Sequence, residues 1–156
     1  MCSSDLGTHI CEVEVDPDTG YVQLVGWYGA DDVGLAINPL ILHGQTHGAA
    51  AQGIGQAMLE DVSYDRDSGQ MLAGSFMDYA VPRADYLPSF NCELIEVPAT
   101  SHKFGIRPGG EGGTTPALGA CINAVCNALA EVGVRHVEMP ATPERVWRAI
   151  QEARAK

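Results

Sequence analysis

The sequence predicts an α+β fold, in which strands and helices are mixed within one domain. Three observations support this fold class. The start of the chain alternates in a β-strand pattern, a long charge-poor segment has helical character, and two helix starts are marked by threonine followed by proline. The 156 residues are enough for one domain with a sizeable core.

A β-hairpin is expected at the beginning of the chain. Residues 8–15 alternate and are rich in β-formers, and residues 21–31 have the same character. Residues 16–20 (Asp-Pro-Asp-Thr-Gly) separate them with a turn composition, because proline fixes φ and glycine closes the turn. A loop follows, bracketed by Asp31-Asp32 and Asn38-Pro39.

Residues 39–60 are expected to form a helix that is buried almost all round, because Glu60 is their only charged residue. Each of the glycines in this segment costs about 1 kcal/mol relative to alanine in a helix interior. We therefore expect the small residues to compensate by packing closely against neighbouring elements. The expected small faces, at i,i+4 spacing, are Gly44 with Gly48, and Ala49 with Gly53 and Ala57.

The second half of the chain is expected to contain one short hairpin, one strand and two helices. The hairpin covers residues 62–72, residues 74–90 are irregular, and residues 91–97 form a strand. After a loop over residues 99–113, Thr115 is expected to cap a helix that begins with Pro116 and runs to about Val132. Thr142 and Pro143 predict the last, amphipathic helix, to about Ala153.

Charge and cysteine content narrow the functional classes. The formal net charge of −11 argues against non-specific binding to nucleic acid or to an anionic membrane. The sequence has no transmembrane-length apolar run, and residues 1–6 are too short and polar for a signal peptide. Five cysteines without a Cys-x-x-Cys pair argue against a disulfide framework or a zinc site. We expect a cytoplasmic protein.

The strongest functional signal is Glu111, which lies between two glycine pairs directly before a predicted helix. Glycine lets the backbone approach a ligand closely, so this carboxylate is a candidate general base. A solvated turn acid is the alternative. A phosphate-binding loop is disfavoured, because the Gly-Lys-Ser/Thr ending is absent and an acid at its centre would repel phosphate.

Polar side chains on the predicted helix over residues 39–60 form a second candidate site. Gln45, Gln52 and Gln56 lie on one stripe. They either form hydrogen bonds between helices or recognise a heterocycle, since a primary amide both donates and accepts. His43 and His47 have metal-ligand spacing, but Gly44 stands where a His-Glu-x-x-His motif has glutamate, so no metal site is predicted.

The remaining acidic pairs are interpreted structurally. Asp31-Asp32 and the Asp65-Arg66-Asp67 segment are expected to be turn acids.

Two motifs together resemble a known family. Residues 44–57 (Gly-Gln-Thr-His-Gly-Ala-Ala-Ala-Gln-Gly-Ile-Gly-Gln-Ala) and 107–114 (Arg-Pro-Gly-Gly-Glu-Gly-Gly-Thr) resemble the xanthine dehydrogenase and aldehyde oxidase family. Within that family, they more closely resemble the large, molybdopterin-binding subunit of the carbon monoxide dehydrogenase type. The resemblance covers residues 7–153, with residues 1–6 and 154–156 as tails, and implies the C-terminal part of the molybdopterin-binding domain of a longer subunit.

The resemblance implies a molybdenum hydroxylase that oxidises an aldehyde, an N-heterocycle or a CO-like small substrate with water-derived oxygen. The implied cofactor is molybdenum-molybdopterin in the cytosine dinucleotide form. Glu111 corresponds to the general base, which acts on a hydroxyl of the molybdenum, and Gln52 corresponds to a pterin contact. The residues expected to bind the cofactor are Gln45, Gly48, Gln52, Gly53, Gly109, Gly110 and Gly112.

The resemblance also implies partners. Iron-sulfur clusters and FAD would lie on separate subunits of a hetero-oligomer, and the remainder of the large subunit would complete the site, so the isolated chain is expected to be inactive. Residues 107–114 differ from the family's common Lys-Gly-Val-Gly-Glu-Ala-Gly-Thr at flanking positions, which leaves the substrate open. The alternative is a cofactor-free assembly domain that keeps the fold.

Overall fold

The fold is described from a computed structural model that defines residues 6–155. Its three-stranded sheet has the order β1-β2-β3. β1 (Gly7–Val15) pairs with β2 (Val22–Asp32) in an antiparallel hairpin, and β2 pairs with β3 (Phe90–Ile95) in a parallel arrangement. The α+β class and the expected first hairpin are confirmed.

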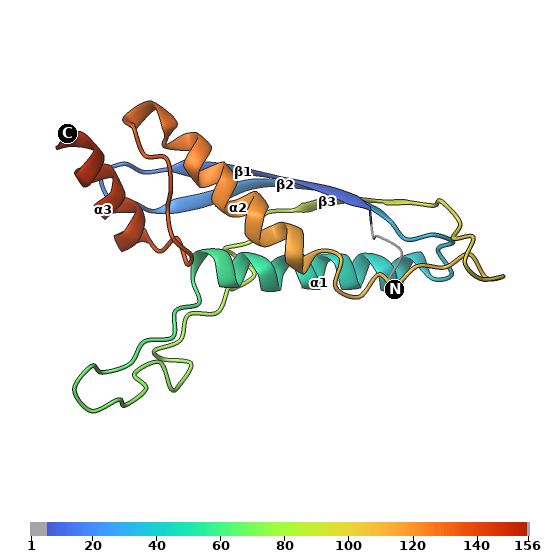
Figure 1. The fold of residues 1–156 in the computed structure, drawn as a ribbon, viewed down its shortest axis with the longest axis horizontal. Helices are drawn as coiled ribbons and strands as arrows, with labels where there is room; N and C mark the ends of the chain where they lie inside the picture. The colour runs from blue at the N-terminus through green and yellow to red at the C-terminus, as the bar shows by residue number, and fades with distance from the viewer. Residues whose placement is uncertain (1–5, 156) are drawn as a thin grey trace.

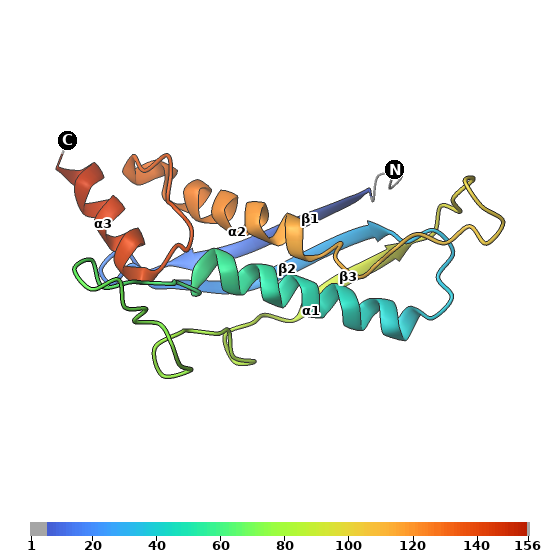
Figure 2. The same ribbon diagram turned by 60° about the horizontal axis from the view of Figure 1, so that its bottom comes forward.

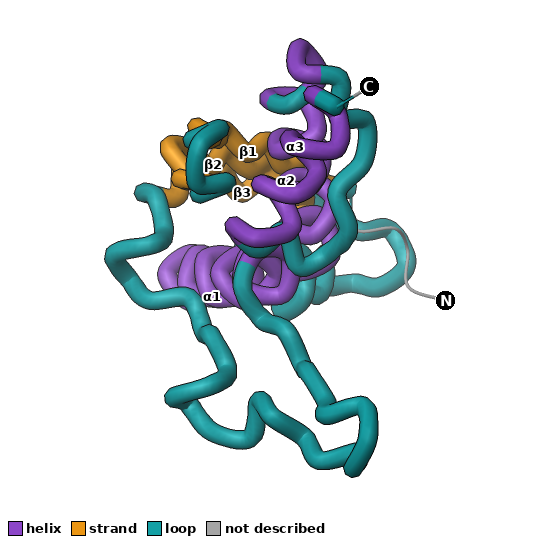
Figure 3. Tube along the Cα trace, turned by 90° about the vertical axis from the view of Figure 1, so that its left-hand side faces the viewer, coloured by secondary structure: helices purple, strands orange, loops and turns teal. Residues whose placement is uncertain are grey.

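Two helices cover one face of this sheet (Figures 1 and 2). α1 (Pro39–Met58) lies next to β3, and α2 (Thr114–Ala128) packs across β1 and against α1. The end-on view separates the sheet from the helices (Figure 3). The core fills the space between these layers. Its largest fully buried side chains are those of Trp27, Ile54, Met58, Val125, Cys121, Val146 and Ile150.

The last helix, α3 (Pro143–Arg154), follows the short 3-10 helix η1 (Ala130–Val132) and packs at the turn of the first hairpin. The Thr142 cap is confirmed, because its side chain accepts a hydrogen bond from the Arg145 N–H at 3.4 Å. Gly20 in the hairpin turn has φ +73°, and a Cβ there would lie 2.6 Å from the Trp147 nitrogen. Glycine at this position therefore lets α3 approach the sheet.

The expected start of the second helix is wrong by two residues. α2 begins at Thr114 with Gly113 as its cap residue, which makes no side-chain capping bond, so Thr115 lies inside the helix. Pro116 is tolerated in this first turn, where the backbone N–H has no intrahelical partner. The chain enters the helix at this point because Gly113 contacts α1, where an added Cβ would lie 2.7 Å from the Thr46 carbonyl oxygen.

The expectation that α1 is buried almost all round is also wrong. Only one face of α1 is buried, and Leu40 near its start is 82% exposed. The absence of charge along this helix therefore does not mark burial. The expected close packing of the face formed by Gly44 and Gly48 is absent, since apart from the helix's own backbone no atom lies within 4 Å of a Cβ built on either residue. The buried residues of α1 are Thr46, Ala49, Ala50, Gly53, Ile54, Gly55, Ala57 and Met58.

Residues 60–89, called the arm below, contain no helix or strand, and the middle of this segment projects away from the sheet and helices (Figures 1 and 3). The expected hairpin is reduced to one antiparallel bridge between Tyr64 and Met71. The side chains of Phe76 and Met77, near the middle of the arm, are 92% and 93% exposed. Within residues 6–155 no helix is both long enough and apolar enough to cross a membrane.

Candidate functional site

Two cavities adjoin the glycine loop that carries Glu111. The helix-side cavity, about 400 Å³, lies between α1 and the loop. The strand-side cavity, about 460 Å³, lies between the loop and the end of β2. Glu111 and Thr115 line both cavities, so this carboxylate lies where the two spaces meet. Both volumes are typical of small-molecule sites.

The structure places most of the predicted site residues around these cavities. Five of them line the helix-side cavity, namely Gln45, Gly48, Gln52, Gly110 and Glu111. Gly109 and Gly112 line the strand-side cavity. Gly53 is placed apart from them, in the contact between α1 and α2, where its added Cβ would lie 2.5 Å from the Thr114 carbonyl oxygen.

The glutamine side chains on α1 are exposed. Gln45, Gln52 and Gln56 form no side-chain hydrogen bond within residues 6–155, which excludes helix-to-helix bonding there. Gln45 and Gln52 line the helix-side cavity, so their amides are available to a ligand that both donates and accepts hydrogen bonds.

Glycines form the open walls of the helix-side cavity. Gly44, Gly48 and Gly110 line it, and a Cβ built on any of them meets no atom within 4 Å. Backbone atoms therefore face the cavity directly, and side chains at these positions would make the cavity narrower. A flat, bulky ligand with polar edges fits this combination of glycine backbone and amide groups.

The N-terminal end of α2 borders both cavities at Thr115. Helix N-termini attract anionic groups such as phosphate, because their first N–H groups lack intrahelical partners. The Glu111 carbonyl accepts a hydrogen bond from the Thr114 N–H at 3.2 Å, which joins the loop to the helix. The Glu111 side chain is exposed and makes no ion pair with another residue between 6 and 155.

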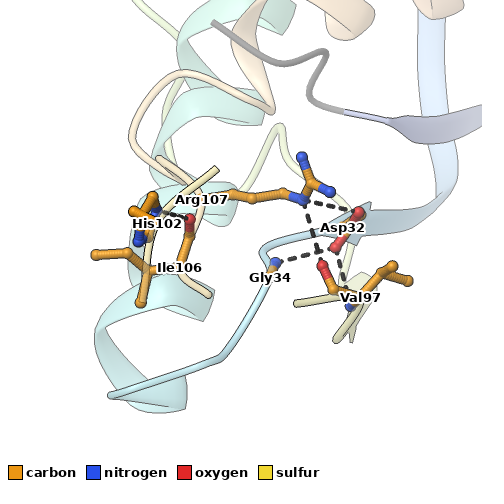
Figure 4. Close-up of polar contacts among 6 residues, drawn as sticks. All are labelled: Asp32, Gly34, Val97, His102, Ile106 and Arg107. Carbon is orange, nitrogen blue, oxygen red and sulfur yellow. Dashed lines mark hydrogen bonds and ion pairs between the residues drawn. The ribbon is translucent and has the colours of Figure 1, made fainter. Parts of the chain in front are cut away.

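Upstream of Glu111, Arg107 anchors the loop on Asp32 (Figure 4). From the sequence, Asp32 is expected only to be a turn acid. Asp32 is 8% exposed and is a buried ion-pair partner, with its Oδ2 3.0 Å from Arg107 Nε. Its Oδ1 accepts from the Gly34 N–H at 2.9 Å and the Val97 N–H at 3.1 Å. Asp32 thus makes the expected turn contact with Gly34 and, in addition, two long-range contacts with Val97 and Arg107 that the sequence did not indicate.

These contacts stabilise the ionised form of Asp32. The Gly34 N–H has the largest influence and lowers the pKa of this carboxyl below its ordinary value, and the Val97 N–H and the Arg107 charge act in the same direction. Desolvation acts in the opposite direction and is outweighed.

The turn-acid interpretation of Asp31 is wrong, because this residue lies within β2 and pairs with both neighbouring strands. It lines the strand-side cavity, and its two carboxylate oxygens lie 3.0 and 3.1 Å from Nε2 of His9. The His9 side chain is fully buried against Trp27, with ring centroids 5.6 Å apart. Asp65, in contrast, is confirmed as a turn acid, since its side chain accepts from the Ser68 N–H at 2.8 Å.

His43 and His47 lie side by side, with ring centroids 5.9 Å apart, and His47 stacks on Phe90. Burial, and after it the neighbouring His43, lowers the pKa of His47. In the part of the chain that the structure defines, no group of three or more His, Cys, Asp or Glu side chains is arranged to hold a metal ion. His47 therefore belongs to the packing between α1 and β3, and His43 lies beside it on α1.

Comparison with known proteins gives a family match. The family model described as a molybdopterin cofactor-binding domain matches residues 2–88. The nicotine 6-hydroxylase large subunit of Paenarthrobacter nicotinovorans is 41% identical over 143 residues, which cover 92% of this chain and 17% of the relative. The carbon monoxide dehydrogenase large chain of Hydrogenophaga pseudoflava is 34% identical over 146 residues, covering 94% of this chain and 18% of the relative.

Solved structures agree with these matches. A Cu,Mo-CO dehydrogenase superposes with a TM-score of 0.90 at 31% identity, covering 96% of this chain and 19% of that one. The quinoline 2-oxidoreductase of Pseudomonas putida 86 gives a TM-score of 0.88 at 38% identity, covering 95% and 19%. The chain thus spans less than a fifth of the length of the proteins that it matches.

Proposed function

Because the chain belongs to the family of molybdopterin cofactor-binding domains, of the carbon monoxide dehydrogenase large-subunit type, we propose that it forms one wall of the cofactor site of a molybdenum hydroxylase. The observation that carries this proposal is the helix-side cavity, where two unpaired amides, open glycines and Glu111 converge. The cavity is open, so other protein must complete it. The remainder of a large subunit is the proposed source of the opposing wall, because the matched relatives are more than five times longer.

The residues of the cavity fit a pterin-type cofactor. The amides of Gln45 and Gln52 would hydrogen-bond the edges of the pterin, since each amide can donate and accept. Gly48 and Gly110 would let the ring system lie directly on the backbone. The N-terminus of α2 would take a phosphate of the cofactor, proposed here in its cytosine dinucleotide form. Gly53 would act indirectly, by setting how closely α1 approaches α2.

Glu111 is the proposed general base. Its carboxylate has no ion-pair partner among the residues defined here and lies between the cofactor side and the strand-side cavity. A small substrate, such as an aldehyde, an N-heterocycle or carbon monoxide, would bind on the strand side. Glu111 would accept the proton of the water-derived oxygen that attacks this substrate. The bound molybdenum cofactor supplies the redox chemistry, and iron-sulfur and FAD subunits are the proposed electron carriers.

Replacement of Glu111 by glutamine in the assembled holoenzyme tests this assignment. Turnover per molybdenum should fall by about 10²–10⁴-fold, the range of general acid–base catalysis, while the molybdenum content stays at the wild-type level. Glu152→Gln is the matched control, because Glu152 is an exposed glutamate on α3 far from the cavities. Wild-type turnover in Glu111→Gln would exclude the role of general base.

A second candidate function is a cofactor-free assembly domain, and the arm favours it. An extended segment that exposes Phe76 and Met77 almost completely has the apolar character of an interaction surface. Molybdenum and pterin analysis of the purified complex separates the two candidates. Stoichiometric molybdenum supports the hydroxylase, whereas a stable complex with neither molybdenum nor pterin supports the assembly domain.

A further inference from the structure

We infer that the Asp32–Arg107 ion pair is a positioning device that sets where the Glu111 carboxylate stands. The inference rests on the proposed function of Glu111 as general base. It assigns a role in turnover to two residues that lie at the base of the loop and not at its tip.

The ion pair joins three segments at the end of β2 (Figure 4). Asp32 receives the Gly34 and Val97 N–H groups on one oxygen and faces Arg107 with the other. The main chain of Arg107 is held as well, because its N–H donates to the Val33 carbonyl at 3.0 Å. Arg107 Nε also lies 3.4 Å from the Val97 carbonyl oxygen. Side chain and backbone of Arg107 are thus fixed to the same edge of the fold.

Glu111 lies between this anchor and a second one. Downstream, the Glu111 carbonyl accepts the Thr114 N–H, and Gly113 is pressed against the backbone of α1. Upstream, Pro108 directly follows Arg107, and its ring restricts φ. Gly110, in contrast, has open space on its Cβ side. With α2 fixed, the ion pair adds to the backbone contact of Arg107 with Val33 and to the packing of Gly109 on Leu42 in limiting the freedom that the glycines allow.

The ion pair is nearly excluded from water. The side chains of Arg107 and Asp32 are 14% and 7% exposed. A shielded pair of this kind is screened little by salt, and the loss of one partner leaves a buried charge without its counterion. A displacement of the base by about 1 Å can cost on the order of 100-fold in rate. A weakened anchor should therefore reduce kcat more than it raises KM.

Asp32→Asn and Arg107→Gln in the assembled holoenzyme test the inference. Asparagine keeps an oxygen for the Gly34 and Val97 N–H groups and removes only the charge. Each variant should lower kcat per molybdenum by about tenfold to 100-fold, with KM changed less than about threefold. The double variant should be no slower than the slower single variant, since both act through one contact. Arg107→Lys, which keeps the charge without the guanidinium geometry, should recover part of the rate.

Hydrogen exchange gives a readout that does not depend on activity. Residues 105–112 should exchange faster in Asp32→Asn than in the wild type, while α2 stays unchanged. Arg148→Gln is the control, because it removes an exposed ion pair with Glu144 on α3, and it should change neither exchange in the loop nor kcat.

Three results would overturn the inference: unchanged kcat per molybdenum in the variants, a loss confined to molybdenum content, or additive losses in the double variant. If Asp32→Asn and Arg107→Gln do not fold, Arg107→Lys is the deciding variant. A wild-type kcat together with wild-type hydrogen exchange in Arg107→Lys would contradict the positioning role. Full activity of Glu111→Gln would instead reject the proposed function itself. Inactive Glu111→Gln together with wild-type Asp32→Asn rejects only the inference.

Discussion

Two stretches of α1 use the same small residues in opposite ways. In the closed stretch, Gly53 lies against α2 so tightly that an added Cβ would lie 2.6 Å from the Ala117 Cβ. In the open stretch, Gly44 and Gly48 have no neighbour within 4 Å of such an atom. Glycine therefore saves space between two helices in one stretch and keeps space free in the other. The identity of a residue does not distinguish these roles; its surroundings do.

The largest expected effect comes from Gly53→Val in the closed stretch. The new side chain would meet the backbone of Thr114, which cannot rotate away, so α1 and α2 must separate. Overpacking of this kind costs about 1–3 kcal/mol of the free energy of unfolding, measured as a lower midpoint in denaturant. The same substitution at Gly48 is the control and should change stability by less than about 0.5 kcal/mol. Equal losses at both sites would abolish the distinction between the stretches.

In the open stretch, Gly48→Val should affect the ligand and spare the fold. The side chain enters the helix-side cavity. We expect a cost of about 1–2 kcal/mol in cofactor binding, roughly tenfold in affinity, read as molybdenum per protein at limiting cofactor. Gly119→Val is the matched control, since Gly119 is a helical glycine with equally open space that lines neither cavity. Undiminished molybdenum in Gly48→Val would argue against this wall.

A smaller effect is expected from Gln52→Ala, which keeps the open stretch open and removes one amide. The loss of one hydrogen bond should cost about 1 kcal/mol, or roughly fivefold in cofactor affinity. The control is Gln56→Ala, an exposed glutamine one turn further along that lines neither cavity. If both variants retain the cofactor like the wild type, the amide does not contact it.

The smallest expected effect is on the stability of the loop at low pH. The folded pKa of Asp32 is lowered, so its stabilising contribution is complete above the unfolded pKa of about 3.9 and is lost as the pH falls through the lower folded value. The loop over residues 99–113 should therefore begin to exchange amide hydrogens in acid before the closed contact at Gly53 does. In Asp32→Asn, the amide exchange rate of the loop, once corrected for the intrinsic pH dependence of exchange, should no longer change as the pH is lowered. Simultaneous opening of both regions would contradict this order.

Local signals made much of the fold predictable. The turn at residues 16–20, Asn38 before Pro39, and Thr142 before Pro143 specify their elements through neighbours in sequence, and the structure has those elements in place. Thr115 shows the limit of this reasoning, because the contact of Gly113 with α1 moves the helix start.

Long-range contacts were the part that could not be predicted. Asp32 meets Arg107 because the chain after β3 returns to the end of β2, where the Arg107 N–H donates to the Val33 carbonyl, and no local pattern near Asp32 indicates this return. The exposed face of α1 could not be predicted either. Absence of charge is typical of a buried helix face, but an exposed face that binds an uncharged ligand edge would have the same composition. Gln45, Gln52 and Glu111 do line one cavity. They could be selected from the sequence because closely spaced glycines marked both segments.

The pairing of β2 with β3 has a consequence for the order of folding. The β1–β2 hairpin joins neighbours in sequence, whereas Trp27 must find Phe90 across α1 and the whole arm. Closing so long a loop loses chain entropy before any contact compensates, so we expect the hairpin and α1 to form early and the parallel pair late. The Asp32 anchor needs Val97, which directly follows that late strand. A newly synthesised chain would therefore have its fold outlined well before it can hold the Glu111 carboxylate, the proposed general base, in a fixed position.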